Sequence, residues 1–158
     1  MTGHGMNLNR TIRNAAAAVF TAGALVMGAA ARASAAPSTP REVVTAFYTE
    51  GFVKRDIAGA AQRYIGDHYI QHSPEIADGR DAVIEALGPV VKDPKYSTSI
   101  VRIVADGDIV VVYAKSVYDG TVRAVVDIYR VANGKIVEHW DVIQDDPGRT
   151  VSGHPFIS

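Results

Sequence analysis

The fold is decided by two segments near the C-terminus, VDIYRV at residues 126–131 and GKIVEHWDVIQ at residues 134–144. Both are rich in β-branched and aromatic residues, and the Asn133-Gly134 pair between them is typical of a tight hairpin turn. Carboxylate and imidazole side chains are rare inside apolar strands unless they line a cavity or a site. These two segments nevertheless contain four such residues: Asp127, Glu138, His139 and Asp141. We therefore expect the functional site on this hairpin.

The register of the hairpin decides whether Asp127 and Asp141 share a face of the sheet. A two-residue loop would place Asp127 opposite Trp140. A three-residue loop closed by Gly134 would place it opposite His139 and keep both acids on one face. We expect the three-residue loop because only Gly134 then needs a left-handed backbone. Both faces of the hairpin are partly apolar, so periodicity does not say which face meets the helices.

The first half of the domain has helical periodicity. The sequence TPRE at residues 39–42 combines an N-cap, a proline and a capping box, and predicts a helix over residues 40–53. Further helices are expected over residues 56–64 and between Asp78-Gly79 and Pro94. Between them, residues 68–72 form a short aromatic segment that predicts a strand or an extended stretch.

From Tyr96 onward the apolar pattern becomes strand-like. Glycine-containing turns separate four β-rich runs, which cover residues 100–105, 109–118, 122–131 and 135–144. Helices followed by such a meander predict an α+β fold, with three N-terminal helices packed on a strongly curved antiparallel sheet.

Residues 1–36 have the pattern of a secretory signal peptide. Arg10 and Arg13 precede an uncharged, alanine-rich segment, and Ala33-Ser34-Ala35 fits a small-residue cleavage site. The weak hydrophobicity of the segment favours cleavage near Ala35 or Ala36 over a retained membrane anchor. We expect a secreted or periplasmic protein with one domain over residues 37–158 and no stable membrane insertion after cleavage.

The composition narrows the possible partners. The chain has 158 residues, a formal net charge of −1 and no cysteine, so its stability depends on packing without disulfides. Nucleic acid is not an expected partner because no basic face is indicated. His68 and His72 have a zinc-binding spacing only on a helix, whereas Pro74 favours an extended segment, so no metal site is expected.

The domain resembles the SnoaL-like polyketide cyclases, a group within the nuclear-transport-factor-2-like (NTF2-like), or cystatin-like cone, superfamily. The segments that carry the resemblance are YIQHSP at 69–74, DGR at 78–80, VDIYRV at 126–131 and GKIVEHWDVIQ at 134–144. The resemblance implies a cone with an internal pocket, often as a homodimer formed through the outer surface of the sheet. In the cyclases an aspartate on the last strand is the acid/base of an aldol closure. Asp141 matches it best, and its partner on the preceding strand would fall at Asp127.

An aldol closure or an enolisation needs a base near the substrate carbonyl and a donor for the enolate oxygen. We expect Asp141 and Asp127 to share these roles, and His72 to orient a substrate oxygen or to exchange a proton. No cofactor is expected. The predicted pocket residues are Tyr113, His139, Tyr69, Tyr48 and Trp140. Trp140 could instead be a core or dimer contact, and His139 a half-exposed strand residue.

Three functions remain open from the sequence. The buried acids favour an enzyme that acts on a small apolar carbonyl compound. The leader, together with Tyr113 and Lys115 where close relatives often have histidines, favours a non-catalytic binder of a small apolar molecule. A dimerisation module is the third possibility, and it predicts a filled interior. The same residues also have structural readings: a carboxylate could pair with Arg102 or Arg123, and His72 could cap the turn at Pro74.

Overall fold

The computed structural model describes residue 37 and residues 39–158, and the predicted leader at 1–36 lies outside them. The helical elements are α1 (Pro40–Tyr48), the π-helical turn η1 (Thr49–Val53), α2 (Ile57–Tyr64) and α3 (Arg80–Lys92). The strands are β1 (Ile65–Gln71), β2 (Tyr96–Asp106), β3 (Ile109–Tyr118), β4 (Thr121–Ala132) and β5 (Lys135–Asp145). This confirms the predicted α+β class and its three helices. Within the described part of the chain, no helix has the length and apolar character needed to span a membrane.

The five strands form one sheet in the order β1-β5-β4-β3-β2. Strands β2 to β5 are an antiparallel meander, as predicted. The edge strand β1 instead pairs in parallel with β5. A parallel pair needs a long connection, and α3 together with strands β2 to β4 lies between these two strands in the chain.

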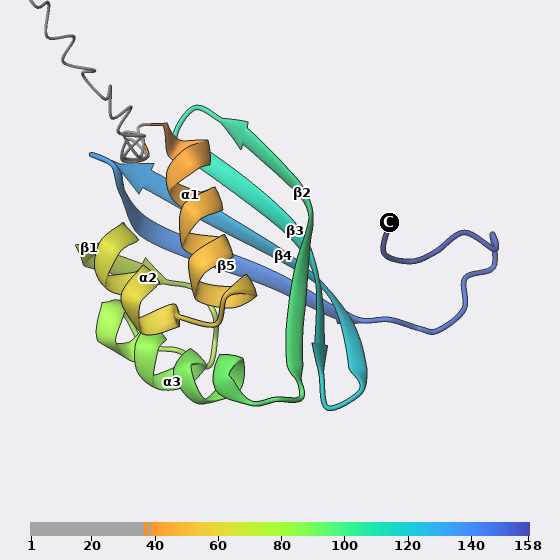
Figure 1. Cartoon of the computed structure of the whole chain (residues 1–158). Helices are drawn as coiled ribbons and strands as arrows, with labels where there is room; N and C mark the ends of the chain where they lie inside the picture. Colours follow the sequence, from red (N-terminus) through yellow and green to blue (C-terminus); the bar gives the residue numbers. More distant parts are fainter. Residues whose placement is uncertain (1–36, 38) are drawn as a thin grey trace, which may run out of the picture. The chain divides into compact units, whose positions relative to one another are not determined.

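The helices cover the concave face of the curved sheet (Figure 1). Helix α1 crosses this face, and α2 and α3 lie side by side next to β1. The start of α1 is fixed by the predicted capping box: Glu42 N–H donates to Thr39 Oγ1 at 3.3 Å, and Thr39 N–H donates to Glu42 Oε2 at 2.9 Å. Asp56 caps α2 by accepting from Gly59 N–H at 3.0 Å.

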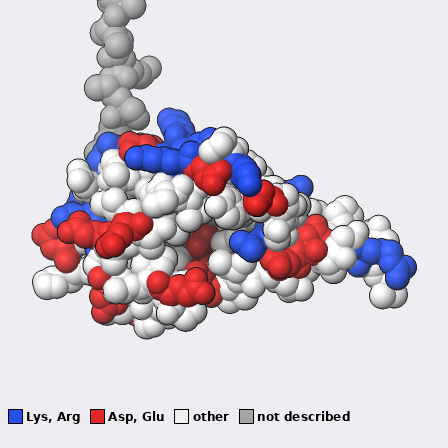
Figure 2. Space-filling view, turned by 90° about the horizontal axis from the view of Figure 1, so that it is seen from below, with Lys and Arg blue, Asp and Glu red and all other residues white. Residues whose placement is uncertain are grey.

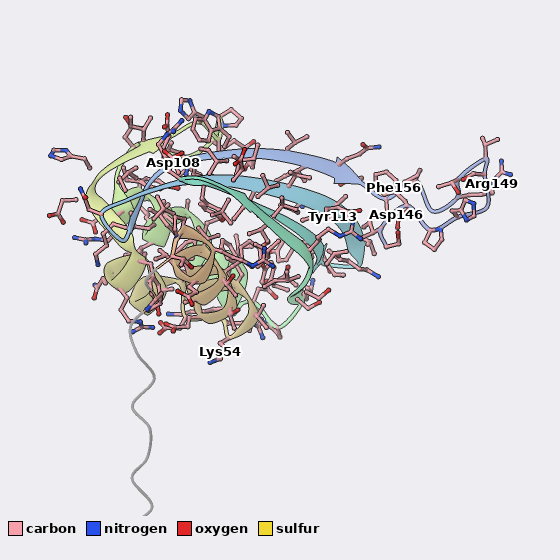
Figure 3. The ribbon with its side chains drawn as sticks, turned by 90° about the horizontal axis from the view of Figure 1, so that it is seen from above. Lys54, Asp108, Tyr113, Asp146, Arg149 and Phe156 are labelled. Carbon is pink, nitrogen blue, oxygen red and sulfur yellow. The ribbon has the colours of Figure 1, made fainter. Side chains whose placement is uncertain are left out.

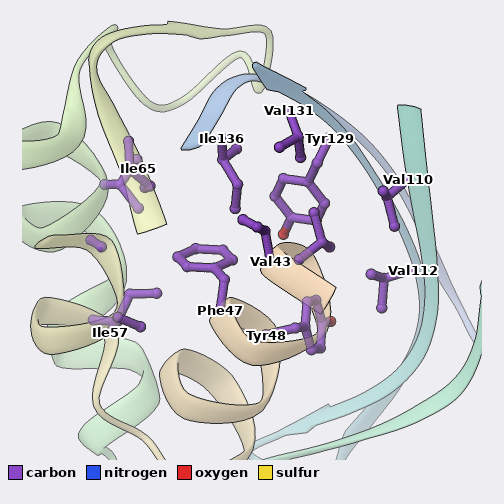
Figure 4. Packing of buried hydrophobic residues seen from close by; sticks show 14 of the residues in the cluster. Val43, Phe47, Tyr48, Ile57, Ile65, Val110, Val112, Tyr129, Val131 and Ile136 are labelled. Carbon is purple, nitrogen blue, oxygen red and sulfur yellow. The ribbon is translucent and has the colours of Figure 1, made fainter. Parts of the chain in front are cut away.

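The core lies between α1 and the inner face of the sheet (Figure 4). The Phe47 ring meets Phe52 and Tyr129 edge-on, with ring centroids 5.9 and 5.7 Å apart. Burying each such side chain contributes about 1.5–3 kcal/mol to folding, so these contacts hold α1 firmly over the sheet. The fully buried members of the core on α1 and the strands are Val43, Val44, Ile65, Val110, Val112, Ala114, Tyr129 and Ile136.

The β4–β5 hairpin has a two-residue loop, so the predicted three-residue loop is wrong. Ala132 pairs with Lys135, and both loop residues are left-handed, with φ of 51° at Asn133 and 73° at Gly134. Asparagine tolerates this conformation better than most residues because its short polar side chain bonds locally. Asn133 and Gly134 therefore close the turn without a third loop residue.

A bulge at Val137 then moves the register of β5 by one residue. Beyond the bulge, Asp127 lies opposite Asp141. The expected partner, His139, lies opposite Tyr129 instead. With the two-residue loop alone, the acids would have pointed to opposite faces of the sheet. Because of the bulge, Asp127 and Asp141 share the inner face, as the sequence predicted.

Candidate functional site

A cavity of about 240 Å³ lies between the helices and the inner face of the sheet. Its walls are mostly apolar and aromatic, with Phe47 and Tyr48 from α1 and Val83 and Leu87 from α3. Figure 2 shows a hollow in the surface with an acidic side chain recessed inside it. A concave apolar site with a few converging polar groups is typical of small-molecule binding. The polar residues at the cavity are Gln71, Ser116, Arg123, Asp127, His139 and Asp141.

Three of these residues, Asp127, His139 and Asp141, form a tight cluster on one wall. One polar atom from each lies within 4.8 Å of the others. Asp127 and His139 are only 7% and 8% exposed, and they are the buried polar residues among those described. Asp141 is partly exposed to the cavity. The two acids predicted from the sequence therefore lie close together on one wall of the cavity.

His139 is held at both ring nitrogens. Its Nε2 lies 3.0 Å from Asp127 Oδ1, and its Nδ1 lies 2.7 Å from Gln71 Oε1. The ring also packs against Tyr129, with centroids 4.8 Å apart. A histidine fixed in this way has one orientation in the site. Gln71 was not predicted, and its place in the YIQHSP segment was the one signal available from the sequence.

Tyrosine hydroxyls surround the acids. Burial raises the pKa of Tyr48 well above its ordinary value, and the negative charge of Asp127 raises it further. Burial is also the main cause that raises the pKa of Tyr69, and Asp127 and Asp141 add to it. Burial raises the pKa of Tyr96 to about 12. These phenols therefore stay protonated at neutral pH and can donate hydrogen bonds to an oxygen in the cavity.

His72 and Trp140 do not line the cavity, contrary to the sequence prediction. Their rings stack on each other, with centroids 4.8 Å apart and 2° between the planes. His72 Nε2 also lies 3.0 Å from Glu138 Oε1. Side chains alternate along a strand, and because His139 points inward, Trp140 must point outward. Trp140 and the His72 ring stacked on it therefore lie on the outer face of the sheet.

Tyr113 also lies outside the cavity. It alternates with the buried residues Val112 and Ala114 of β3 and so faces outward. Its hydroxyl donates to the carbonyl of Phe156 at 3.4 Å, in the segment that follows β5 (Figure 3). Tyr113 therefore contacts the C-terminal segment and not the candidate site.

Arg123 lines the cavity but does not neutralise either central acid. Its Nε donates to Asp145 Oδ1 at 2.9 Å. Asp141 makes no hydrogen bond or ion pair with the residues that the structure describes. The alternative in which an arginine pairs with Asp127 or Asp141 is therefore not observed.

The cluster of Asp127, His139 and Asp141 is close enough to be considered for a metal ion. However, His139 Nε2 and Asp127 Oδ1 are within hydrogen-bond distance of each other, so a metal ion could bind here only by displacing the proton that joins them. The arrangement is that of a hydrogen-bonded acid/base group. A carboxylate facing the cavity can accept a proton there, and the phenols can stabilise a developing oxyanion.

Comparisons with known proteins identify the family and the fold. The family model described as "SnoaL-like domain" matches residues 44–139, which is more than half of the chain. A comparison with curated proteins finds no match.

Several solved structures have the same fold. An NTF2-like protein of unknown function from Cytophaga hutchinsonii superposes with a TM-score of 0.56 and 15% identity, over 70% of this chain and 92% of its own. A candidate SnoaL-like polyketide cyclase from Jannaschia sp. CCS1 superposes with a TM-score of 0.56 and 18% identity, over 66% of this chain and 85% of its own. A candidate ketosteroid isomerase from Kribbella flavida superposes with a TM-score of 0.57 and 16% identity, over 66% of this chain and 77% of its own. At such identities the likeness shows the fold alone. The chain belongs to the SnoaL-like domain family and has the NTF2-like α+β cone fold.

Proposed function

We propose that this protein is a cofactor-independent acid/base enzyme that moves a proton next to the carbonyl group of a small apolar compound. Aldol closure and isomerisation are the two reactions of this type that its structural relatives suggest, since they include a candidate polyketide cyclase and a candidate ketosteroid isomerase. The observation that carries the proposal is the cluster of Asp127, His139 and Asp141 on one wall of an otherwise apolar cavity. A simple binder of apolar molecules gains nothing from such groups, because burying them costs free energy.

Asp141 is the base in this proposal. It faces the cavity and has no bonded partner among the described residues, so its carboxylate is available to a substrate. Tyr69 lines the same cavity and keeps its phenol proton, so it can hold the enolate oxygen. Tyr48 also lines the cavity, but its hydroxyl is hydrogen-bonded to the Asp127 side chain. Asp127 is bonded to His139 and is therefore less available to a substrate than Asp141.

A second candidate function is the binding of a small apolar molecule without chemistry. The mostly apolar cavity walls favour it. The third possibility, a dimerisation module with a filled interior, is disfavoured by the open cavity of about 240 Å³.

The test is proton exchange in a model substrate. The bicyclic ketone 2-tetralone is incubated in D₂O with the native protein or with Asp141→Asn, in the presence of EDTA, and loss of its α-proton NMR signals is followed. We expect the native protein to accelerate exchange and Asp141→Asn to lose the acceleration while still binding the ketone. Equal exchange with both proteins, together with equal binding, would favour the non-catalytic binder.

We also infer that the outer face of the sheet meets a second copy of this chain. Val104, Val111, Ile128 and Trp140 form a cross-strand row on this face, and Val104 is 55% exposed. Val142, in the next row, is 63% exposed. Such an apolar face is typical of a partner contact. Light scattering should give the mass of a dimer for the native protein and of a monomer for Val142→Glu, and a monomeric native protein would contradict the inference.

A further inference from the structure

We propose that Gln71 is a positioning residue that fixes where two protons of the site lie, one at His139 and one at Tyr69. Gln71 is the last residue of β1, and this end of the strand is held on both sides. Its backbone N–H donates to Asp78 Oδ1 at 2.8 Å, and the next N–H, that of His72, donates to the carbonyl of His139 at 3.0 Å. The Gln71 side chain therefore starts from a fixed backbone.

The orientation of the Gln71 amide follows from Ser73. The backbone N–H of Ser73 lies 3.0 Å from Gln71 Oε1, and a backbone N–H can only donate. The reversed amide would set its own NH₂ group against this donor. The group that faces Ser73, and with it His139, is therefore the oxygen.

This oxygen determines which ring nitrogen of His139 carries a hydrogen. Because Gln71 Oε1 accepts, the His139 Nδ1 that lies 2.7 Å away must carry a hydrogen. The other nitrogen, Nε2, lies 3.0 Å from Asp127 Oδ1. A bare nitrogen lone pair facing a bare carboxylate at this distance would be repelled. One proton therefore lies between them, on the nitrogen or on the oxygen, and the pair carries no net charge in either case.

The NH₂ group of the Gln71 amide determines the direction in which the Tyr69 hydroxyl hydrogen points. Gln71 Nε2 donates to the Tyr69 hydroxyl oxygen at 3.3 Å. The phenol's own hydrogen must then point away from Gln71, and Tyr69 lines the cavity. One neutral side chain thus directs a donor into the cavity from Tyr69 and holds a proton in the His139–Asp127 contact.

This arrangement separates the roles of the two carboxylates. Two charged carboxylates this close would repel each other and favour protonation of one. The proton between Asp127 and His139 neutralises that pair, so Asp141 opposite it remains the carboxylate that can accept a proton. This functional role rests on the proposed acid/base reaction, whereas the proton positions do not.

The first experiment locates the proton on His139. Two-bond ¹H–¹⁵N NMR spectra of the ¹⁵N-labelled full chain report which ring nitrogens are protonated, and His139→Phe identifies the signals. We expect a protonated Nδ1 at neutral pH. An unprotonated Nδ1 in the native protein would overturn the proposal.

Two variants separate the two effects of Gln71. Gln71→Leu removes both, so His139 should lose its Nδ1 hydrogen to solvent and keep a single ring hydrogen on Nε2, which the Asp127 carboxylate accepts. Gln71→Glu still accepts from Ser73 and from His139 Nδ1, but it reverses the bond to Tyr69 because a carboxylate cannot donate. It should therefore keep a protonated Nδ1. Gln144→Leu, an exposed glutamine on β5, is the matched control and should change nothing.

The 2-tetralone exchange assay distinguishes the inference from the proposed function. Gln71→Leu and Gln71→Glu should lower kcat by up to about 100-fold with little change in KM, because a small misplacement of a group in the site can cost that much in rate. Native protein with the expected His139 signals and no exchange activity would contradict the proposed function and leave the proton positions standing. Active protein whose kcat is unchanged in folded Gln71→Leu would overturn the positioning role. If Gln71→Leu does not fold, the native spectrum and Gln71→Glu decide the question.

Discussion

Asp127 and Asp141 lie directly opposite each other on β4 and β5, and both face the cavity. They differ in their bonds: Asp127 is tied to His139, whereas Asp141 has no bonded partner among the described residues. Two chemically identical side chains on one cavity wall therefore have different environments, and the predictions about each differ accordingly.

Replacing Asp141 with Asn should lower the exchange rate of 2-tetralone by about 10²- to 10⁴-fold, the usual contribution of a general base. The melting temperature should change little, because no bond in the described part of the chain is lost. Asp106→Asn removes an exposed carboxylate at the end of β2 and serves as the control. A fully active Asp141→Asn protein would refute the role of Asp141 as base.

Replacing Asp127 with Ala should lower the free energy of unfolding by about 1–3 kcal/mol, because His139 Nε2 loses its buried partner. Asp127→Asn should retain most of the stability, since its amide can donate to the same nitrogen. Urea denaturation of both variants measures the difference. Equal stability of the two variants would show that the buried contact with His139 is not stabilising.

Replacing Gly134 with Ala should lower the free energy of unfolding by about 1 kcal/mol, because a side chain is strained at a left-handed position. The φ of Gly134 is +73°, and no neighbouring atom would contact an added Cβ, so the strain comes from the backbone alone. Gly66→Ala is the matched control: its φ is not left-handed, and an added Cβ would meet its nearest neighbours at an ordinary 3.5 Å. Urea denaturation should show a loss for the first variant only.

Glu138 should make stability depend on pH. A hydrogen bond from His72, and then one from Arg130, hold the pKa of Glu138 below its ordinary value of 4.5. A lowered pKa in the folded state means that the stabilisation is present above pH 4.5 and is lost as the pH falls through the folded-state value. The difference in melting temperature between native protein and Glu138→Gln should therefore be present at neutral pH and shrink in acid. Glu75→Gln, which replaces an exposed glutamate, should show no such trend.

The leader prediction concerns residues 1–36, outside the described residues. Protein purified from its native host should have an intact mass that begins after Ala35 or Ala36 if the leader is cleaved. A mass that begins at Met1 would contradict cleavage.

Local signals in the sequence predicted most of the fold. The capping box at Thr39 and the change from helical to strand periodicity near Tyr96 determine elements through contacts within a few residues. The shared face of Asp127 and Asp141 was also predicted, but through a loop that the structure does not have. A two-residue loop followed by a bulge at Val137 places the two acids on the same face, as a three-residue loop would have done. No local signal in the sequence predicts the bulge.

The parts of the site that could not be predicted depend on distant pairing. Whether His72 or Gln71 points into the cavity depends on the parallel pairing of β1 with β5, more than sixty positions along the chain. Trp140 and Tyr113 both lie on the outer face because side chains alternate along a strand, and aromatic character alone does not indicate which face a residue occupies.

The parallel edge strand has a consequence for biosynthesis. Tyr69 and Gln71 lie on β1, whose one neighbour in the sheet is β5, the last strand of the chain. A nascent polypeptide that ends before residue 135 therefore has neither His139 and Asp141 nor the strand to which β1 docks. The candidate site can assemble only after the last strand has emerged from the ribosome, so it should form in a single late step of synthesis.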